Sequence, residues 1–85
     1  MYDDKRLYSL NCAAYVATST NIMPQVLKDE ETNTAYFVFP ECEGVASAIR
    51  LYKTGQPRLY LHEFLTSIRF LRKSMKEVLD NGEEN

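Results

Sequence analysis

The strongest strand pattern in this chain is the run Thr-Ala-Tyr-Phe-Val-Phe near its middle, which is apolar after the threonine. Neighbouring side chains of a strand point to opposite faces, so Ala35, Phe37 and Phe39 would share one face. Tyr36 and Val38 would share the other. Apolar residues on both faces predict a central strand that is covered on both sides, or a strand whose outer face is used by a partner.

The segment before this strand predicts the other half of a hairpin. Gln25–Asp29 has a weaker strand pattern, and the polar residues 30–33 supply the turn. Thr34–Phe39 is followed by Pro40, which cannot donate a backbone hydrogen bond and therefore ends the strand.

The N-terminal segment predicts a short strand and then a short helix. Over residues 5–10, one set of positions (Arg6, Tyr8 and Leu10) alternates with another (Leu7 and Ser9), which favours a short strand. Asn11 can cap a helix over residues 12–19, whose three alanines are small enough to pack closely on a sheet.

Two further helices are predicted after the hairpin. The first of these helices is favoured by acidic residues at its N-terminal end, and Gly55 fits the position after its last turn. Residues 58–61 predict either a short edge strand or an extended lead-in to the last helix, which covers residues 62–80. The apolar positions are Val45, Ala48, Ile49 and Tyr52 in the first helix, then Leu61, Phe64, Ile68, Leu71, Met75 and Val78 in the last, widened by Leu65 and Leu79.

The predicted order is therefore βαββαα, an α+β fold in which helices pack mainly on one face of a small antiparallel sheet. The 85 residues form one domain, 1–85, with frayed ends at about residues 1–4 and 82–85. A chain of this length buries only about 60–65% of its unfolded surface, so its stability margin is thin. Self-association would add buried area, and we expect a homodimer whose copies could share the stripe of the last helix.

Composition indicates an ordered cytoplasmic protein. The apolar fraction is 45%, and no apolar run approaches the roughly 20 residues that span a bilayer. The N-terminus has no apolar segment typical of a signal peptide. Cys12 and Cys42 have neither the spacing of a disulfide framework nor enough histidine for a zinc site, so both are expected to be reduced and mostly buried.

Charge is distributed unevenly along the chain. The segment 44–76 holds seven cations and one acid, a formal charge of +6, whereas the whole chain carries −2 and the remaining residues therefore sum to −8. A basic face of this kind is a candidate binding surface for an anionic partner. The candidate residues are Arg50, Lys53, Arg58, Arg69, Arg72, Lys73 and Lys76.

Four of these cations, residues 69, 72, 73 and 76, share one face of the last helix by their spacing. Such a row can follow nucleic-acid phosphates, and arginines also alternate with tyrosines elsewhere, as in proteins that bind single strands. The alternatives are a solvated helix face and tyrosines at the edge of the core. The strand Thr34–Phe39 has only a loose likeness to the aromatic strand of an RNA-recognition motif, without its Lys/Arg-Gly opening.

The sequence predicts no enzyme, cofactor or metal site. His62 is the single histidine and lies at the start of the last helix, where a capping or surface role is expected. No nucleophile has a motif spacing, and the three glycines are too scattered for a phosphate-binding loop.

Several segments together carry a family resemblance: Leu7-Tyr-Ser-Leu, Ala13-Ala-Tyr-Val, the Tyr-Phe-Val-Phe strand, Leu51-Tyr-Lys-Thr-Gly and the Leu61-x-x-Phe64…Leu71-Arg72 helix. Over residues 5–75 the chain resembles short uncharacterised domains of Firmicute bacteria and their phages and prophages. This resemblance implies a small accessory protein of a mobile element and transfers no site residue.

Our leading hypothesis is a small non-enzymatic interaction module that binds another protein and itself. Tyr36, Val38 and Phe70 are its candidate interface residues. The alternative is a nucleic-acid-binding module that uses the basic residues of the last two helices.

Overall fold

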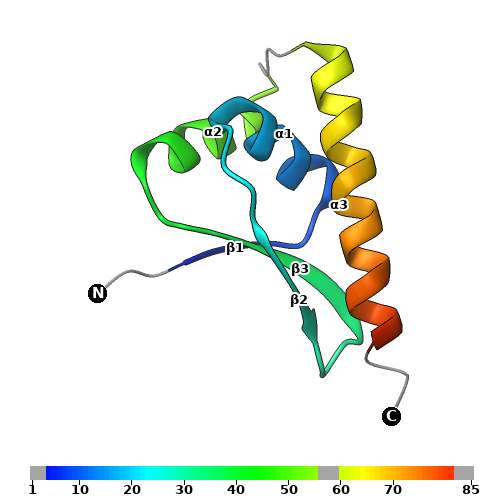
Figure 1. Ribbon diagram of the computed structural model, residues 1–85. Coiled ribbons are helices and arrows are strands. Elements are labelled where there is room, and N and C mark those ends of the chain that lie inside the picture. The colour runs from blue at the N-terminus through cyan, green and yellow to red at the C-terminus, as the bar shows by residue number, and fades with distance from the viewer. Residues whose placement is uncertain (1–3, 56–59, 82–85) are drawn as a thin grey trace.

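A computed structural model describes residues 4–55 and 60–81 of the chain (Figure 1). The elements along the chain are β1 (Lys5–Leu7), α1 (Leu10–Thr20), β2 (Gln25–Asp29), β3 (Thr34–Phe39), α2 (Glu43–Lys53) and α3 (Leu61–Asn81). This order confirms the predicted βαββαα arrangement and the α+β class.

The three strands form one antiparallel sheet in the order β1-β3-β2, so the strand with the strongest sequence pattern is the central one. In β1, Arg6 is paired with Val38, and in β2, Leu27 is paired with Tyr36. Both bounds of the hairpin agree with the prediction. Asn33 has a φ of 59° in the turn, a left-handed conformation that asparagine tolerates better than most residues.

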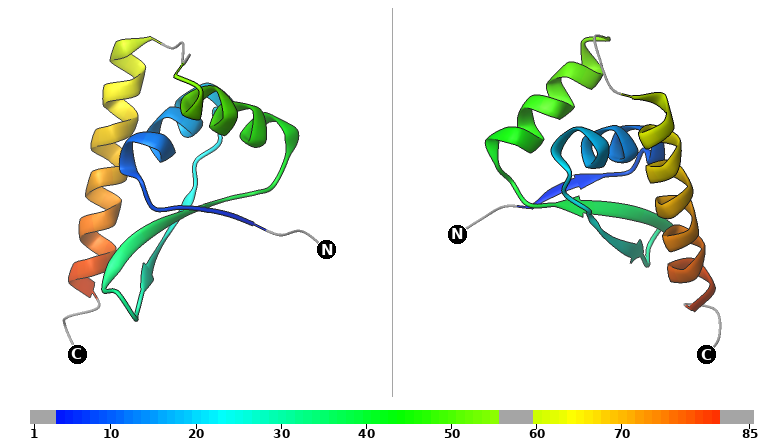
Figure 2. Two further views of the ribbon diagram at one scale, coloured as in Figure 1. Left: turned by 180° about the vertical axis from the view of Figure 1, so that it is seen from behind. Right: turned by 45° about the horizontal axis from the view of Figure 1, so that its top comes forward.

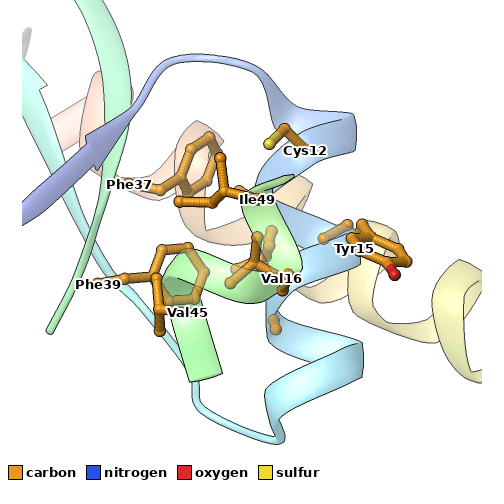
Figure 3. Close-up of a cluster of buried hydrophobic side chains, with 12 residues drawn as sticks. Cys12, Tyr15, Val16, Phe37, Phe39, Val45 and Ile49 are labelled. Carbon is orange, nitrogen blue, oxygen red and sulfur yellow. The ribbon is translucent and has the colours of Figure 1, made fainter. Parts of the chain in front are cut away.

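All three helices contribute side chains to the core that buries the inner face of the sheet. In the three views of Figures 1 and 2, α1 lies between α2 and α3, and it packs on both of them. Phe37 and Phe39 are fully buried beneath Val16 of α1 and Val45 of α2, as Figure 3 shows. Leu71 of α3, also fully buried, joins the same core.

The prediction for the first two elements was wrong in its boundaries. β1 ends at Leu7, and α1 begins two residues earlier than predicted because Ser9, not Asn11, is its N-cap. The Ser9 hydroxyl accepts a hydrogen bond from the backbone N–H of Cys12 at 3.2 Å. Because the residue after an N-cap is the first residue of the helix, a cap at Ser9 starts α1 at Leu10, and the strand cannot continue to residue 10.

The end of α2 agrees with the prediction. Gly55 follows the last turn with a φ of 78°, the left-handed conformation for which glycine is suited. At the start of α2, Cys42 is the extended N-cap residue. The prediction that both cysteines are mostly buried is wrong for Cys42, which is exposed at this cap, and is confirmed for Cys12. Of the predicted edge strand at 58–61, residues 58 and 59 lie outside the described residues, Tyr60 has no regular structure and Leu61 begins α3.

The apolar stripe of α3 agrees with the prediction over most of its length and differs near the start of the helix. The predicted positions that are buried or half-buried are Phe64, Ile68, Leu71, Met75, Val78 and Leu79. Leu61 and Leu65, predicted to be part of the stripe, are 69% and 40% exposed, whereas Ser67 is buried. The hydroxyls of Ser67 and Thr18 share a hydrogen bond of 2.8 Å across the contact between α3 and α1. This polar contact holds α3 against α1, and it leaves the two leucines on the outward flank.

Candidate functional site

The outer face of the sheet is the first candidate surface. Val38 and Tyr36 of β3 are half-buried on this face, and the register places Leu27 of β2 beside Tyr36. The helices described here pack over the opposite face, as both turned views show (Figure 2). In the described part of the chain, β3 is therefore the central strand but is covered by helices on one face only.

Aromatic and cationic groups from β1 and the residues after it complete this face. The rings of Tyr8 and Tyr36 lie with their centroids 5.4 Å apart and their planes tilted by 31°. The Arg6 guanidinium lies 5.3 Å from the centroid of the Tyr36 ring, a cation–π distance. We call the residues of this surface the sheet-face cluster: Arg6, Tyr8, Leu27, Tyr36 and Val38.

Sequence reasoning identified Tyr36 and Val38 but did not assign Leu27 to a surface. The sequence contained one signal for this position, because Leu27 is an apolar residue within a predicted strand. Its neighbours Val26 and Lys28 point to the helix side, so Leu27 points to the outer face. Its face becomes known only when the register with β3 is known, since a slip by one residue would reverse it.

The predicted basic residues do not form one patch. Arg69, Arg72, Lys73 and Lys76 are all exposed on the outer side of α3, as their spacing predicts. Arg50 and Lys53 are exposed on α2, and α1 lies between the two helices. A joint patch required α2 and α3 to lie side by side, so the structure separates these two groups. Arg58 lies outside the described residues.

A second candidate surface lies on α3 beside the basic row. Phe70 is 53% exposed in the middle of the helix, although it is one of the largest apolar side chains in the chain. Glu63, Thr66 and Lys73 are exposed at spacings that place them on the same side of the helix as Phe70. We call these four residues the α3 outer face.

A shallow pocket of about 310 Å³ adjoins the α3 outer face. Its lining comes from α1, from the segment before β2 and from the first turns of α3, and it includes Met23, which is 53% exposed. The lining residues are Ala17, Thr18, Asn21, Met23, His62, Glu63, Thr66 and Ser67.

His62 is exposed at the rim of this pocket, and its backbone carbonyl accepts a hydrogen bond from the Thr66 hydroxyl at 3.0 Å. The hydroxyls of Thr18 and Ser67 also line the pocket, and the Thr18 hydroxyl donates a hydrogen bond to the Ser67 hydroxyl. Among residues 4–55 and 60–81, no three His, Cys, Asp or Glu side chains are grouped as a metal site would require. The pocket is therefore lined mainly by polar side chains, and Ala17 and Met23 are its apolar lining residues.

The buried thiol of Cys12 lies in surroundings that lower its reactivity. Burial raises the pKa of Cys12, and the nearby charge of Lys53 lowers that pKa by a smaller amount. A thiol with a raised pKa forms little thiolate, which is the reactive species, so Cys12 is suited to packing.

Comparisons with models of protein families, with curated proteins and with solved structures gave no match. The resemblance to short domains of Firmicute bacteria and their phages stays a prediction. Within the described residues, none of the helices combines the length and the apolar character needed to cross a membrane.

Proposed function

We propose that this chain is a small non-enzymatic module that binds another protein through the sheet-face cluster and also associates with itself. The observation that carries the proposal is the position of Tyr36 and Val38 on the outer face of the central strand. Burying half-exposed apolar and aromatic side chains against a partner is favourable, and tyrosine and arginine are enriched at protein interfaces.

The chemistry of the cluster defines the kind of partner. Leu27 and Val38 offer an apolar floor, and the rings of Tyr8 and Tyr36 offer hydroxyl groups at its edge. The Arg6 guanidinium can pair with a carboxylate, a strong charge-assisted contact. A peptide segment with apolar residues next to an Asp or Glu would satisfy all three features.

Selection from a random peptide library tests this proposal. Peptides selected on the wild-type protein should be apolar with an acidic residue, and they should shift the NMR signals of Arg6, Tyr36 and Val38. Val38→Lys should abolish their binding, whereas Glu31→Lys, which adds the same residue in the exposed hairpin turn, should keep it. Failure to select any peptide, or signal shifts confined to the helices, would refute the proposed binding face.

The setting of this function is also a proposal. The reduced, unpaired state of Cys12 and Cys42 is consistent with the cytoplasm. In the setting that the family resemblance implies, the module would be an accessory protein of a bacterium, phage or prophage that acts by binding.

A second candidate function is nucleic-acid binding through α3. The supporting observation is that Arg69, Arg72, Lys73 and Lys76 are all exposed within two turns of one helix. Binding through phosphates weakens steeply as salt is added, because each contact releases condensed counterions. Titration with random-sequence DNA and RNA at two salt concentrations tests this function, and absence of binding at low salt would reject it.

A further inference from the structure

We propose that two copies of this chain associate through antiparallel packing of their α3 helices, with the α3 outer face of each copy against that of the other. The inference rests on the self-association included in the proposed function and names its interface. The occupant of the surface is a second copy of the same chain.

The four residues of the α3 outer face have the spacing of a helix-packing surface. Glu63, Thr66, Phe70 and Lys73 lie at i, i+3, i+7 and i+10, which is the repeat that keeps side chains on one side of a helix in contact with a partner helix. All four are exposed, and Phe70 provides an apolar centre. Between residues 63 and 73, this face of α3 thus presents an acid, then a ring and then a cation.

This arrangement is complementary to itself only when the two helices run in opposite directions. In an antiparallel pair, position numbers that face each other have a constant sum. The register that places Glu63 opposite Lys73 of the second copy also places Thr66 opposite Phe70 of the second copy, because both pairs have the same sum. One register therefore satisfies the charges and covers the ring.

The pocket beside α3 explains where the ring would go. Thr66 lines that pocket, so Phe70 of the second copy would lie at its rim, near the exposed side chain of Met23. Methionine adapts its shape to neighbouring rings and makes favourable contacts between sulfur and aromatic groups. The two large apolar side chains left exposed on this side, Phe70 and Met23, would both be covered by the same contact.

The symmetry of the contact limits the assembly to two copies. A two-fold axis perpendicular to the helices repeats every pair, so the interface contains two Glu63–Lys73 pairs and two Phe70–Thr66 contacts. An interface in which both copies use the same surface is closed, since no further copy can be added. The sheet-face cluster is not part of this contact.

Charge reversal tests the register. In Glu63→Lys, and separately in Lys73→Glu, two like-charge pairs would replace two attractive pairs, and the dimer should weaken at least about tenfold. The double variant restores both pairs and should recover the wild-type dimer. An equimolar mixture of the two single variants should form a heterodimer, because each copy then supplies the charges that the other lacks.

Sedimentation equilibrium at several protein concentrations gives the dissociation constants. Lys53→Glu is the matched control, since it makes the same charge change on α2, which α1 separates from α3, and it should leave the dimer unchanged. Phe70→Gln should give a monomer, and circular dichroism would establish that this exposed substitution leaves the fold intact.

The possible results separate this inference from the proposal on which it rests. A wild-type protein that stays monomeric at millimolar concentration would refute self-association altogether. A dimer that both single reversals leave intact would refute the α3 interface and keep self-association. Weakening in the single variants without recovery in the double variant or the mixture would refute the antiparallel register.

Discussion

Replacement of Leu71 by alanine tests the central role that the structure gives to α3. Leu71 is fully buried where α3 meets the core, and the substitution leaves a cavity that the surrounding helices and sheet fill only in part. Leucine-to-alanine changes at such sites cost about 2–5 kcal/mol. A domain of 85 residues has a total stability of roughly 4–13 kcal/mol, so this loss is a large part of it.

Leu65→Ala is the matched control for this prediction. It removes the same atoms from the same helix and makes the same change in helix propensity, but Leu65 is already 40% exposed and no closed cavity forms. Its cost should be about 1 kcal/mol, from the apolar surface that is lost. Because each kcal/mol lowers the Tm of a domain of this size by about 4–8 °C, the Tm values of the two variants should differ by at least about 4 °C.

Urea denaturation followed by circular dichroism measures both free energies of unfolding. It should be done at a low protein concentration, so that self-association does not add to the measured stability. If Leu71→Ala fails to fold, Leu71→Val makes a smaller cavity and keeps the comparison measurable. Equal losses for positions 71 and 65 would refute the packing of α3 described above.

Two further predictions concern the ends of helices and the cysteines. Ser9→Ala should lower the free energy of unfolding by about 0.5–2 kcal/mol because it removes the N-cap of α1, whereas Asn11→Ala should have little effect; chemical denaturation compares them, and the reverse order would place the cap at Asn11. Native protein should react with a thiol reagent at Cys42 and not at Cys12, and mass spectrometry of the labelled peptides distinguishes the two sites. Burial raises the pKa of Cys12, so with increasing pH this thiol loses its proton in the unfolded chain before it does so in the folded protein. The contribution of Cys12 to the free energy of unfolding is therefore fully present below the ordinary thiol pKa of about 8.5 and is lost as the pH rises through the raised pKa of the folded protein. Cys12→Ala should remove this pH dependence, which urea denaturation at several pH values measures.

The hairpin was predictable because every signal for it is local. Thr34–Phe39 alternates two apolar faces, a proline ends it, and a polar turn connects it to Gln25–Asp29. The start of α1 was predicted less well because Ser9 and Asn11 are both good capping residues and lie two positions apart. Only the structure shows which of them accepts the hydrogen bond from Cys12.

The candidate surfaces depended on information that is not local. The spacing of four cations placed them together on α3, but the position of α1 separates them from Arg50 and Lys53. The burial of Ser67 could not be predicted from apolar spacing, because serine is polar. Its hydroxyl is hydrogen-bonded to Thr18, 49 residues away in the chain. Tertiary contacts of this kind decide which flank of an amphipathic helix faces solvent.

The strand order also sets the sequence in which this fold can be assembled. The β2–β3 hairpin joins neighbouring segments and can form as soon as both have been synthesised. The first strand has to wait, because Lys5 is paired with Phe39, 34 residues later in the chain. Closing so long a segment has a higher entropic cost than closing a turn, so we expect β1 to join the sheet after the hairpin has formed. Tyr8 and Arg6 belong to that N-terminal segment, and therefore the proposed binding face is complete only after β1 has joined the hairpin.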